Sequence, residues 1–168
     1  SRNNIKIGVI LQGAETPFMK EVLKGIQEAC AEVDNLGGTV LVHKIEHQNA
    51  EDVILAMEKM RMEEVSGIAM VPLDEERVKR EIDRFVEEFR IPVVTFTSDV
   101  EDTKRLCFVG QNGVQCGRAA AGLMGELTGG KGKVAVISGY STNTSLSSRV
   151  VGFREEIARK YPGIEIIG

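Results

Sequence analysis

Runs of apolar residues alternate with longer segments of mixed polarity along the first half of the chain. The runs rich in apolar residues cover residues 5–11, 39–45, 66–72 and 91–96. Their length and composition predict strands, and the nearly continuous apolar character of the first predicts burial on both faces. The segments between them place apolar residues at helical spacing, which predicts helices that bury one face. This alternation predicts a parallel sheet with right-handed crossover connections.

Capping residues indicate where the helices begin. Thr16 followed by Pro17 is typical of a hydroxyl N-cap with proline at the first helical position, and the apolar stripe beyond it extends to about Val33. Asp74 is predicted to cap the helix between the third and fourth strands. Asn112 is predicted to cap the helix that follows the fifth strand.

The organisation changes after the strand at 91–96. Residues 97–105 are mostly polar and too few for a useful helix, and a short strand at 106–110 follows directly. We therefore place a domain boundary here, with a first lobe at 1–109 and a second lobe at 110–168.

The second lobe is predicted to be incomplete. It starts with a helix in which Gly113, Gly117 and Ala121 recur every four residues, a flat stripe suited to close packing against another backbone. A strand at 133–138, a helix with one apolar face and a final strand at 164–167 follow. So few elements cannot cover a parallel strand on both faces, so we expect this chain to be the front part of a longer protein.

Composition restricts the classes of function. The chain has 168 residues, 42% of them hydrophobic, and a formal net charge of −4. It can bury a substantial core, but it has no basic field that would attract nucleic acid or an anionic membrane. Its apolar runs fall far short of the ~20 residues of a membrane helix. Cys30, Cys107 and Cys116 have no metal-binding or disulfide spacing, which favours reduced side chains in a cytosol.

One segment matches part of a nucleotide-binding motif. Gly125, Gly130 and Lys131 follow the phosphate-loop pattern, but Gly132 stands where Ser or Thr binds magnesium. The segment also joins a helix to a strand, whereas a phosphate loop joins a strand to a helix. We interpret it as a turn.

Other residues with catalytic or metal-binding chemistry are isolated. His43 and His47 are four residues apart but have no evident third metal ligand. Ser141 lies outside a G-x-S-x-G motif, and neither histidine is placed to act as its base. The sequence therefore predicts neither an enzyme nor a bound metal or cofactor.

Polar residues follow the carboxyl ends of the predicted strands. They are rich in hydroxyl and amide groups, with an aromatic ring near one loop and an arginine in the last helix. Because the carboxyl ends of parallel strands meet at one edge, we expect a ligand there, and this chemistry suits a sugar or related polyol. The alternative is that these are ordinary loop and capping residues. The candidates are Gln12, Thr16, Phe18, Thr97, Ser98, Asp99, Gln111, Tyr140, Ser145 and Arg149.

Five segments resemble one family in order and spacing. They read IGVIL…TPFMKEVLKGIQEA, GIAMVPLD, IPVVTFTSD, FVGQNGVQCGRAAAGLM and GKVAVISG…SSRVVGFREEI. Together they resemble type I periplasmic binding proteins and the effector-binding domains of LacI/GalR transcription regulators, over nearly all of the chain. FVGQN at 108–112 and the R-x-x-G-F pattern at 149–153 are the most specific.

The resemblance implies an α/β fold of two doubly wound lobes with parallel sheets. Three crossing segments join the lobes, and the ligand lies in the cleft between them. On the side of the first lobe it implies contacts from Gln12, Thr16 and Phe18, with Phe18 stacked on a sugar ring. Thr97 and Ser98 match the end of the fourth strand.

The resemblance also implies contacts from beyond the first lobe. Gln111 matches a crossing segment, and Tyr140 and Ser145 come from the second lobe. Arg149 completes this set, with its guanidinium donating two hydrogen bonds in a fork.

The sequence departs from the family pattern at two positions. Sugar binders of the family often have an acidic residue where Thr97 stands and a second aromatic residue where Met19 stands. Asp99 would compensate for the first change if the register differed by two residues.

The resemblance implies a sensor. The favoured interpretation is the effector-binding domain of a cytoplasmic LacI-like regulator, which forms a homodimer and contacts DNA only through a headpiece outside this chain. The small molecule then shifts an equilibrium between two conformations of the dimer. The alternative is an exported sugar- or solute-binding protein of a transport system, located in the periplasm or outside the cell.

Overall fold

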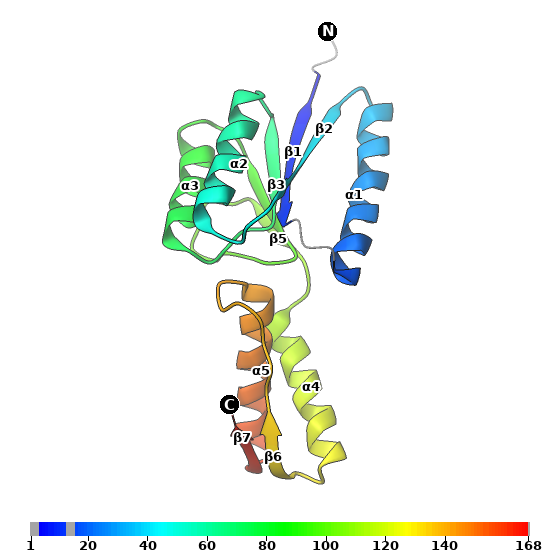
Figure 1. The fold of residues 1–168 in the computed structure, drawn as a ribbon, viewed down its shortest axis with the longest axis vertical. Helices are drawn as coiled ribbons and strands as arrows, with labels where there is room; N and C mark the ends of the chain where they lie inside the picture. Colours follow the sequence, from blue (N-terminus) through cyan, green and yellow to red (C-terminus); the bar gives the residue numbers. More distant parts are fainter. Residues whose placement is uncertain (1–3, 13–15, 168) are drawn as a thin grey trace. The chain divides into compact units, whose positions relative to one another are not determined.

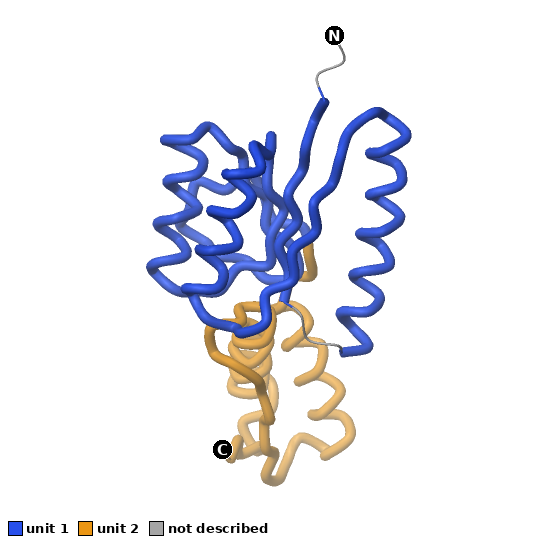
Figure 2. The backbone as a smooth tube through the Cα atoms, turned by 45° about the horizontal axis from the view of Figure 1, so that its top comes forward, with its two compact units in different colours: residues 1–109 blue, residues 110–168 orange. Residues whose placement is uncertain are grey.

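The computed structural model describes residues 4–12 and 16–167. They form two compact units, which divide between Val109 and Gly110 (Figure 2). Each unit contains helices and a parallel sheet, of five described strands in the first unit and two in the second. The α/β architecture predicted from the sequence is confirmed.

The first unit is built on a parallel sheet in the order β2-β1-β3-β4-β5 (Figure 1). The strand β1 pairs with β2 on one side and with β3 on the other, so the strand order reverses at β1. This reversal is the switch point of a doubly wound sheet. The strands are β1 (Lys6–Gln12), β2 (Thr39–Ile45), β3 (Gly67–Met70), β4 (Val93–Phe96) and β5 (Cys107–Val109).

Helices cover both faces of this sheet. On one face, α2 and α3 enclose a core in which Ile10, Met57 and Phe85 are fully buried. On the other face, α1 buries Met19 against Leu11. Each fully buried large apolar side chain contributes about 1.5–3 kcal/mol to folding. The helices are α1 (Pro17–Asn35), α2 (Ala50–Met62) and α3 (Glu76–Glu87).

The face under α1 is only partly covered. An apolar groove of about 290 Å³ lies over the neighbouring strands, and Ile5 and Leu106 at its rim are 53% and 66% exposed. One face of the first sheet is therefore fully packed, and the other is packed only where α1 lies. The groove is lined by Ile5, Ile7, Ser66, Gly67, Ile68, Ala69, Pro92, Val94 and Leu106.

The starts of α1 and α3 test the capping predictions. The Thr16 hydroxyl accepts a hydrogen bond from the backbone N–H of Met19 at 3.1 Å, which confirms the N-cap. The prediction that Asp74 caps α3 is wrong, because the helix is capped at Glu75 without a side-chain hydrogen bond. Asp74 lies one residue too early to reach the first turn, and its carboxylate pairs with Lys79 at 2.8 Å.

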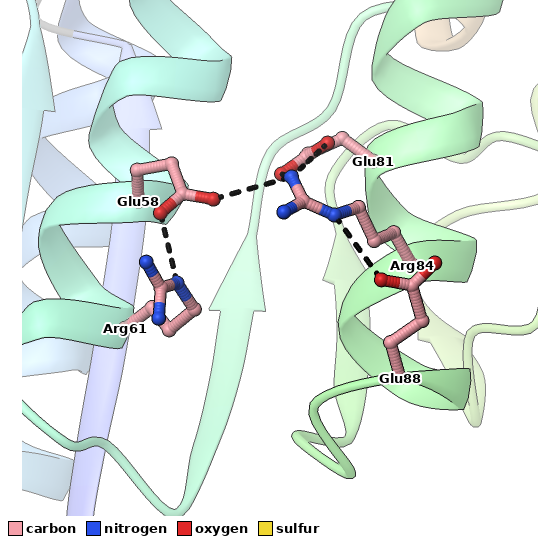
Figure 3. A network of polar contacts seen from close by, with 5 residues as sticks. All are labelled: Glu58, Arg61, Glu81, Arg84 and Glu88. Carbon is pink, nitrogen blue, oxygen red and sulfur yellow. Dashed lines mark hydrogen bonds and ion pairs between the residues drawn. The ribbon is translucent and has the colours of Figure 1, made fainter.

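A charge network joins the exposed sides of α2 and α3 (Figure 3). The Arg84 Nη1 donates to Glu81 at 3.2 Å and contacts Glu58 at 3.5 Å. Arg61 Nε donates to the other Glu58 oxygen at 2.8 Å, and the Arg61 and Arg84 guanidinium groups lie 4.8 and 4.7 Å from the Phe89 ring centroid. Burial raises the pKa of Glu81 above its ordinary value, and the Arg84 charge opposes that shift. Within this network the Glu58–Arg84 pair links α2 to α3.

The second unit contains two helices and a two-stranded parallel sheet (Figure 1). The strand β6 begins and ends earlier than the predicted segment 133–138. The last residue pair between β6 and its neighbour is Ala135 with Ile167. The elements are α4 (Gly113–Leu127), β6 (Lys131–Ala135), α5 (Thr144–Lys160) and β7 (Gly163–Ile167).

The helices α4 and α5 touch through their backbones. A Cβ atom at Gly117 would lie 2.0 Å from the Arg149 carbonyl oxygen, and one at Gly152 would lie 2.0 Å from the Val114 carbonyl oxygen. No side chain fits at those distances, so the approach requires glycine at both positions. The flat stripe predicted from the sequence is confirmed, and Ala121 within it is fully buried.

Candidate ligand-binding residues

The carboxyl ends of β1 and β4 lie at the same edge of the first sheet. Ile10, Met70 and Thr95 stand in register across β1, β3 and β4. Gln12 and Thr97 each follow two residues later and so lie at the same level. Because neighbouring strands are ~4.8 Å apart, the ends of β1 and β4 are about 10 Å apart. The structure therefore places Gln12 and Thr97 near one another.

The side-chain amide of Gln12 is buried at the end of β1. The residue is 8% exposed, and its Nε2 has no hydrogen-bond partner among the described residues. A buried donor left unpaired costs about 1–3 kcal/mol, and such groups are rare in folded proteins. This amide at the end of β1 is therefore a strong candidate to donate to a ligand.

Thr16 and Phe18 lie at the start of α1. The Thr16 hydroxyl oxygen accepts the capping bond, so its hydrogen can still be donated. The Phe18 side chain is 60% exposed, whereas Met19 beside it is buried. An exposed aromatic ring at the start of this helix offers an apolar platform, and the stacking role that the resemblance implies for it stays a prediction.

The turn after β4 is strained. Thr97 has a φ of 60°, in the left-handed region that favours glycine, and its N–H donates to the Val109 carbonyl oxygen at 3.1 Å. Ser98 is 2% exposed, and its N–H donates to the Phe96 carbonyl oxygen at 2.8 Å. Strained non-glycine residues cluster at functional sites.

Asp99 binds groups of the first unit. Arg105 donates to both of its carboxylate oxygens at 2.5 Å, and the Thr95 hydroxyl donates to Oδ1 at 2.8 Å. Burial raises the pKa of Asp99, but the hydrogen bonds from Arg105 and Thr95 outweigh burial and lower it below its ordinary value. Sequence reasoning missed Arg105, because a charge pair across a loop leaves no local periodic signal.

Gln111 and Arg149 meet in the second unit. Arg149 Nη2 donates to Gln111 Oε1 at 3.0 Å, although the residues are 38 positions apart. The contact of α4 with α5 brings them together, since Gln111 lies just before the N-cap of α4 and Arg149 lies on α5. Asn112 caps α4 as predicted, with its side chain accepting from the Gln115 N–H at 3.0 Å. Gln111 thus orients a guanidinium that has donors left over.

Ser145 lies in the first turn of α5, close to its N-cap. Asn143 is the N-cap, and its Oδ1 accepts from the Ser145 N–H at 3.1 Å and the Ser145 hydroxyl at 2.8 Å. Thr16 is therefore an N-cap, whereas Ser145 donates to one. Tyr140, in the preceding loop, is 70% exposed.

The motifs that resembled catalytic or metal sites have other roles in the structure. The glycine- and lysine-containing segment forms the α4-to-β6 turn, with Gly129 and Gly130 at positive φ. His47 is bonded to Asp52 at 3.1 Å. In the described part of the chain, no group of three or more His, Cys, Asp or Glu residues could hold a metal ion. None of the helices described is long and apolar enough to cross a membrane.

A family model for the periplasmic binding protein domain matches residues 7–168. The chain belongs to this family. Its members are binding proteins and not enzymes, which agrees with the prediction from the sequence. No curated protein matches the chain significantly.

Solved structures share the fold over nearly the whole chain. An ABC-transporter solute-binding protein from Burkholderia graminis in complex with D-arabinose is 27% identical, with a TM-score of 0.87 over 98% of this chain and 55% of that one. A glucose-galactose binding protein from Geobacillus stearothermophilus is 25% identical, with a TM-score of 0.86 over 99% and 57%. A putative LacI transcriptional regulator from Bacteroides fragilis is 21% identical, with a TM-score of 0.85 over 98% and 58%, and shows likeness of fold alone. The chain therefore spans little more than half the length of these proteins.

Proposed function

We propose that this chain binds a sugar or related polyol and forms part of the effector-binding domain of a LacI-like transcription regulator. The observation that carries the binding proposal is the buried Gln12 amide at the end of β1, whose Nε2 has no partner among the described residues, with the exposed Phe18 ring at the start of the helix that follows. A buried donor and an exposed ring suit a molecule that has hydroxyl groups and apolar ring faces.

Each unit contributes residues to the proposed binding. In the first unit, Gln12 and the hydroxyl groups of Thr16, Thr97 and Ser98 bond to ligand oxygens, and Phe18 stacks on the sugar ring. These residues follow β1 and β4, whose ends lie at one edge of the sheet.

In the second unit, Arg149 donates a fork of hydrogen bonds while Gln111 holds its guanidinium. Tyr140 and Ser145 supply further contacts from the loop before α5 and its first turn. Arg149 carries the largest share of the binding energy on this side, because charged donors make stronger hydrogen bonds than neutral ones.

The cysteines favour the regulator over the transport protein. Cys30, Cys107 and Cys116 are all free, which fits a reducing cytosol. In this proposal the protein is a cytoplasmic homodimer that contacts DNA through a headpiece outside the chain, and ligand binding shifts the dimer between two states.

The second candidate is an exported sugar-binding protein of a transport system. Two of the similar structures described above are sugar-binding proteins, one of them from an ABC transporter. The coding sequence upstream of residue 1 separates the two candidates. A helix-turn-helix segment supports the regulator, and a signal peptide supports transport.

A thermal-shift series on the full-length protein tests the binding proposal. D-arabinose, D-glucose, D-galactose and D-fructose are the probes, and at least one is expected to raise the melting temperature by several degrees. Arg149→Ala is expected to remove most of that shift. Arg118→Ala is the matched control, since Arg118 pairs with Glu155 on the exposed side of the same helices and should keep the shift. An Arg149→Ala protein that binds as well as wild type contradicts the role of Arg149.

A further inference from the structure

The loop between β4 and β5 is closed by an ion pair. Arg105 donates from Nε and Nη2 to the two carboxylate oxygens of Asp99, six residues earlier, both at 2.5 Å. The Arg105 and Asp99 side chains are only 19% and 18% exposed. A forked, charge-assisted pair restricts direction as well as distance. The ion pair therefore holds the two ends of the loop together.

Asp99 is also bonded to β4. Thr95, fully buried in that strand, donates its hydroxyl to Asp99 Oδ1 at 2.8 Å, and the Val100 N–H donates to the same oxygen at 2.9 Å. Arg105 lies two residues before Cys107, the first residue of β5, and β5 pairs with β4. One carboxylate thus connects the end of β4 to the start of β5.

Thr97 and Ser98 lie between these anchors. Thr97 keeps its left-handed conformation with its N–H bonded to the Val109 carbonyl oxygen, and Ser98 is almost fully buried. A strained backbone persists only where its surroundings enforce it. The Asp99 ion pair supplies the constraint on one side of the turn, and β5 supplies it on the other.

We propose that Arg105 is a positioning residue for ligand binding. It holds Asp99, and through Asp99 the turn at Thr97 and Ser98, in the conformation that presents these two side chains at the carboxyl edge of the first sheet. This inference rests on the proposed function, because it requires that the turn contacts the ligand. Asp99 then acts inside the unit and does not replace the acidic residue that other sugar binders have at the position of Thr97.

Amide hydrogen exchange, measured by NMR on the full-length protein, tests the positioning without any ligand. Arg105→Ala is expected to raise the exchange rates of the Thr97 and Ser98 amides about tenfold or more, while rates in α2 stay unchanged. Arg61→Ala is the matched control, because it removes an arginine that pairs with Glu58 in the same unit and should leave the turn unaffected. Unchanged exchange at the turn in Arg105→Ala overturns the proposal.

Affinity for the same four sugars tests the consequence for binding. Calorimetry on Arg105→Ala is expected to show a dissociation constant about tenfold higher for the sugar that wild type binds best. Arg105→Lys keeps the charge but loses the fork, so it should restore only part of the affinity. If Arg105→Ala does not fold, Arg105→Lys carries the comparison. Either variant folding normally and binding as tightly as wild type contradicts the inference.

The two measurements separate this inference from the function on which it rests. If wild type binds none of the four sugars, the proposed function is contradicted, and the ligand part of the inference fails with it. Exchange rates at Thr97 and Ser98 then still decide whether Arg105 holds the turn. If wild type binds a sugar and Arg105→Ala binds it with the same affinity, the proposed function stands and only the role of Arg105 is contradicted.

Discussion

The two units differ in how their helices and strands pack together. In the first unit, parallel strands lie between helices on both faces, and Ile10 and Phe85 in its main core are fully buried. In the second unit, β6 pairs only with β7 among the described strands, and Ile137, shortly after β6, is 98% exposed. The first unit is packed around a sheet with helices on both faces. In the second unit α4 packs directly on α5, beside a small core of Ala121, Val134, Phe153, Ile157 and Ile164.

The candidate ligand-binding residues of the two units are also positioned by different elements. Gln12 and Thr97 are placed by the ends of sheet strands, so their geometry depends on the core beneath the sheet. Gln111 and Arg149 are placed by the helix pair, so their geometry depends on two glycine contacts. A substitution in one unit should therefore change the stability of that unit and leave the other unit unchanged.

The largest expected effect is loss of the first core. Phe85 is fully buried and lies edge to face with Phe89 at 5.3 Å, so Phe85→Ala should lower the free energy of unfolding by about 3–5 kcal/mol. Phe18→Ala, at a ring that is 60% exposed, is the control and should change it by less than about 0.5 kcal/mol. Urea unfolding measures both, and hydrogen exchange should locate the loss within residues 4–109. An equal rise of exchange in α4 and α5 would show that the units are not separate in stability.

The next effect concerns the helix contact. A Cβ at Gly117 would meet the Arg149 carbonyl oxygen, so Gly117→Ala should force α4 from α5 and cost the second unit about 1–3 kcal/mol. Gly122 lies in the same helix with nothing within 4 Å of its Cβ position, so Gly122→Ala should stabilise by about 0.5–1 kcal/mol. Exchange rates across α4 and α5 measure both changes. If Gly117→Ala and Gly122→Ala shift the exchange rates in the same direction, the backbone contact between α4 and α5 does not stabilise this unit.

The smallest effect is the pH dependence of Asp99. Its pKa is lower in the folded protein than the ordinary value of 3.8, so its ionised form stabilises the fold above that pH, and the contribution is lost as pH falls through the folded pKa. Asp99→Asn should therefore cost about 1 kcal/mol at neutral pH, and the difference from wild type should narrow on acidification. Urea unfolding at neutral and acid pH measures this. Glu28→Gln is the control, because Glu28 is exposed on α1. If the free energy of unfolding of Asp99→Asn differs from that of wild type by the same amount at all pH values, the ionised carboxylate is not the source of the stabilisation.

Sequence reasoning succeeded where a feature depends on near neighbours in the chain. Thr16 and Asn112 were predicted as caps and make the expected bonds to residues three positions later. It failed for Asp74, because the ion pair with Lys79 and the later start of α3 were not visible in the capping pattern. The limits of β6 also differed from the predicted segment 133–138.

The amino-acid sequence by itself determined which segments are strands and helices, the parallel alternation of the first unit, and the small-residue stripe of α4. Apolar periodicity and capping act over a few residues, so they can be detected without a fold. Only the tertiary structure decided that Asp99 binds Arg105, that Arg149 reaches Gln111, and that the Gln12 amide is buried without a partner among the described residues. Such contacts depend on how the chain returns to itself through strand order and helix packing, and local patterns carry no record of those distances.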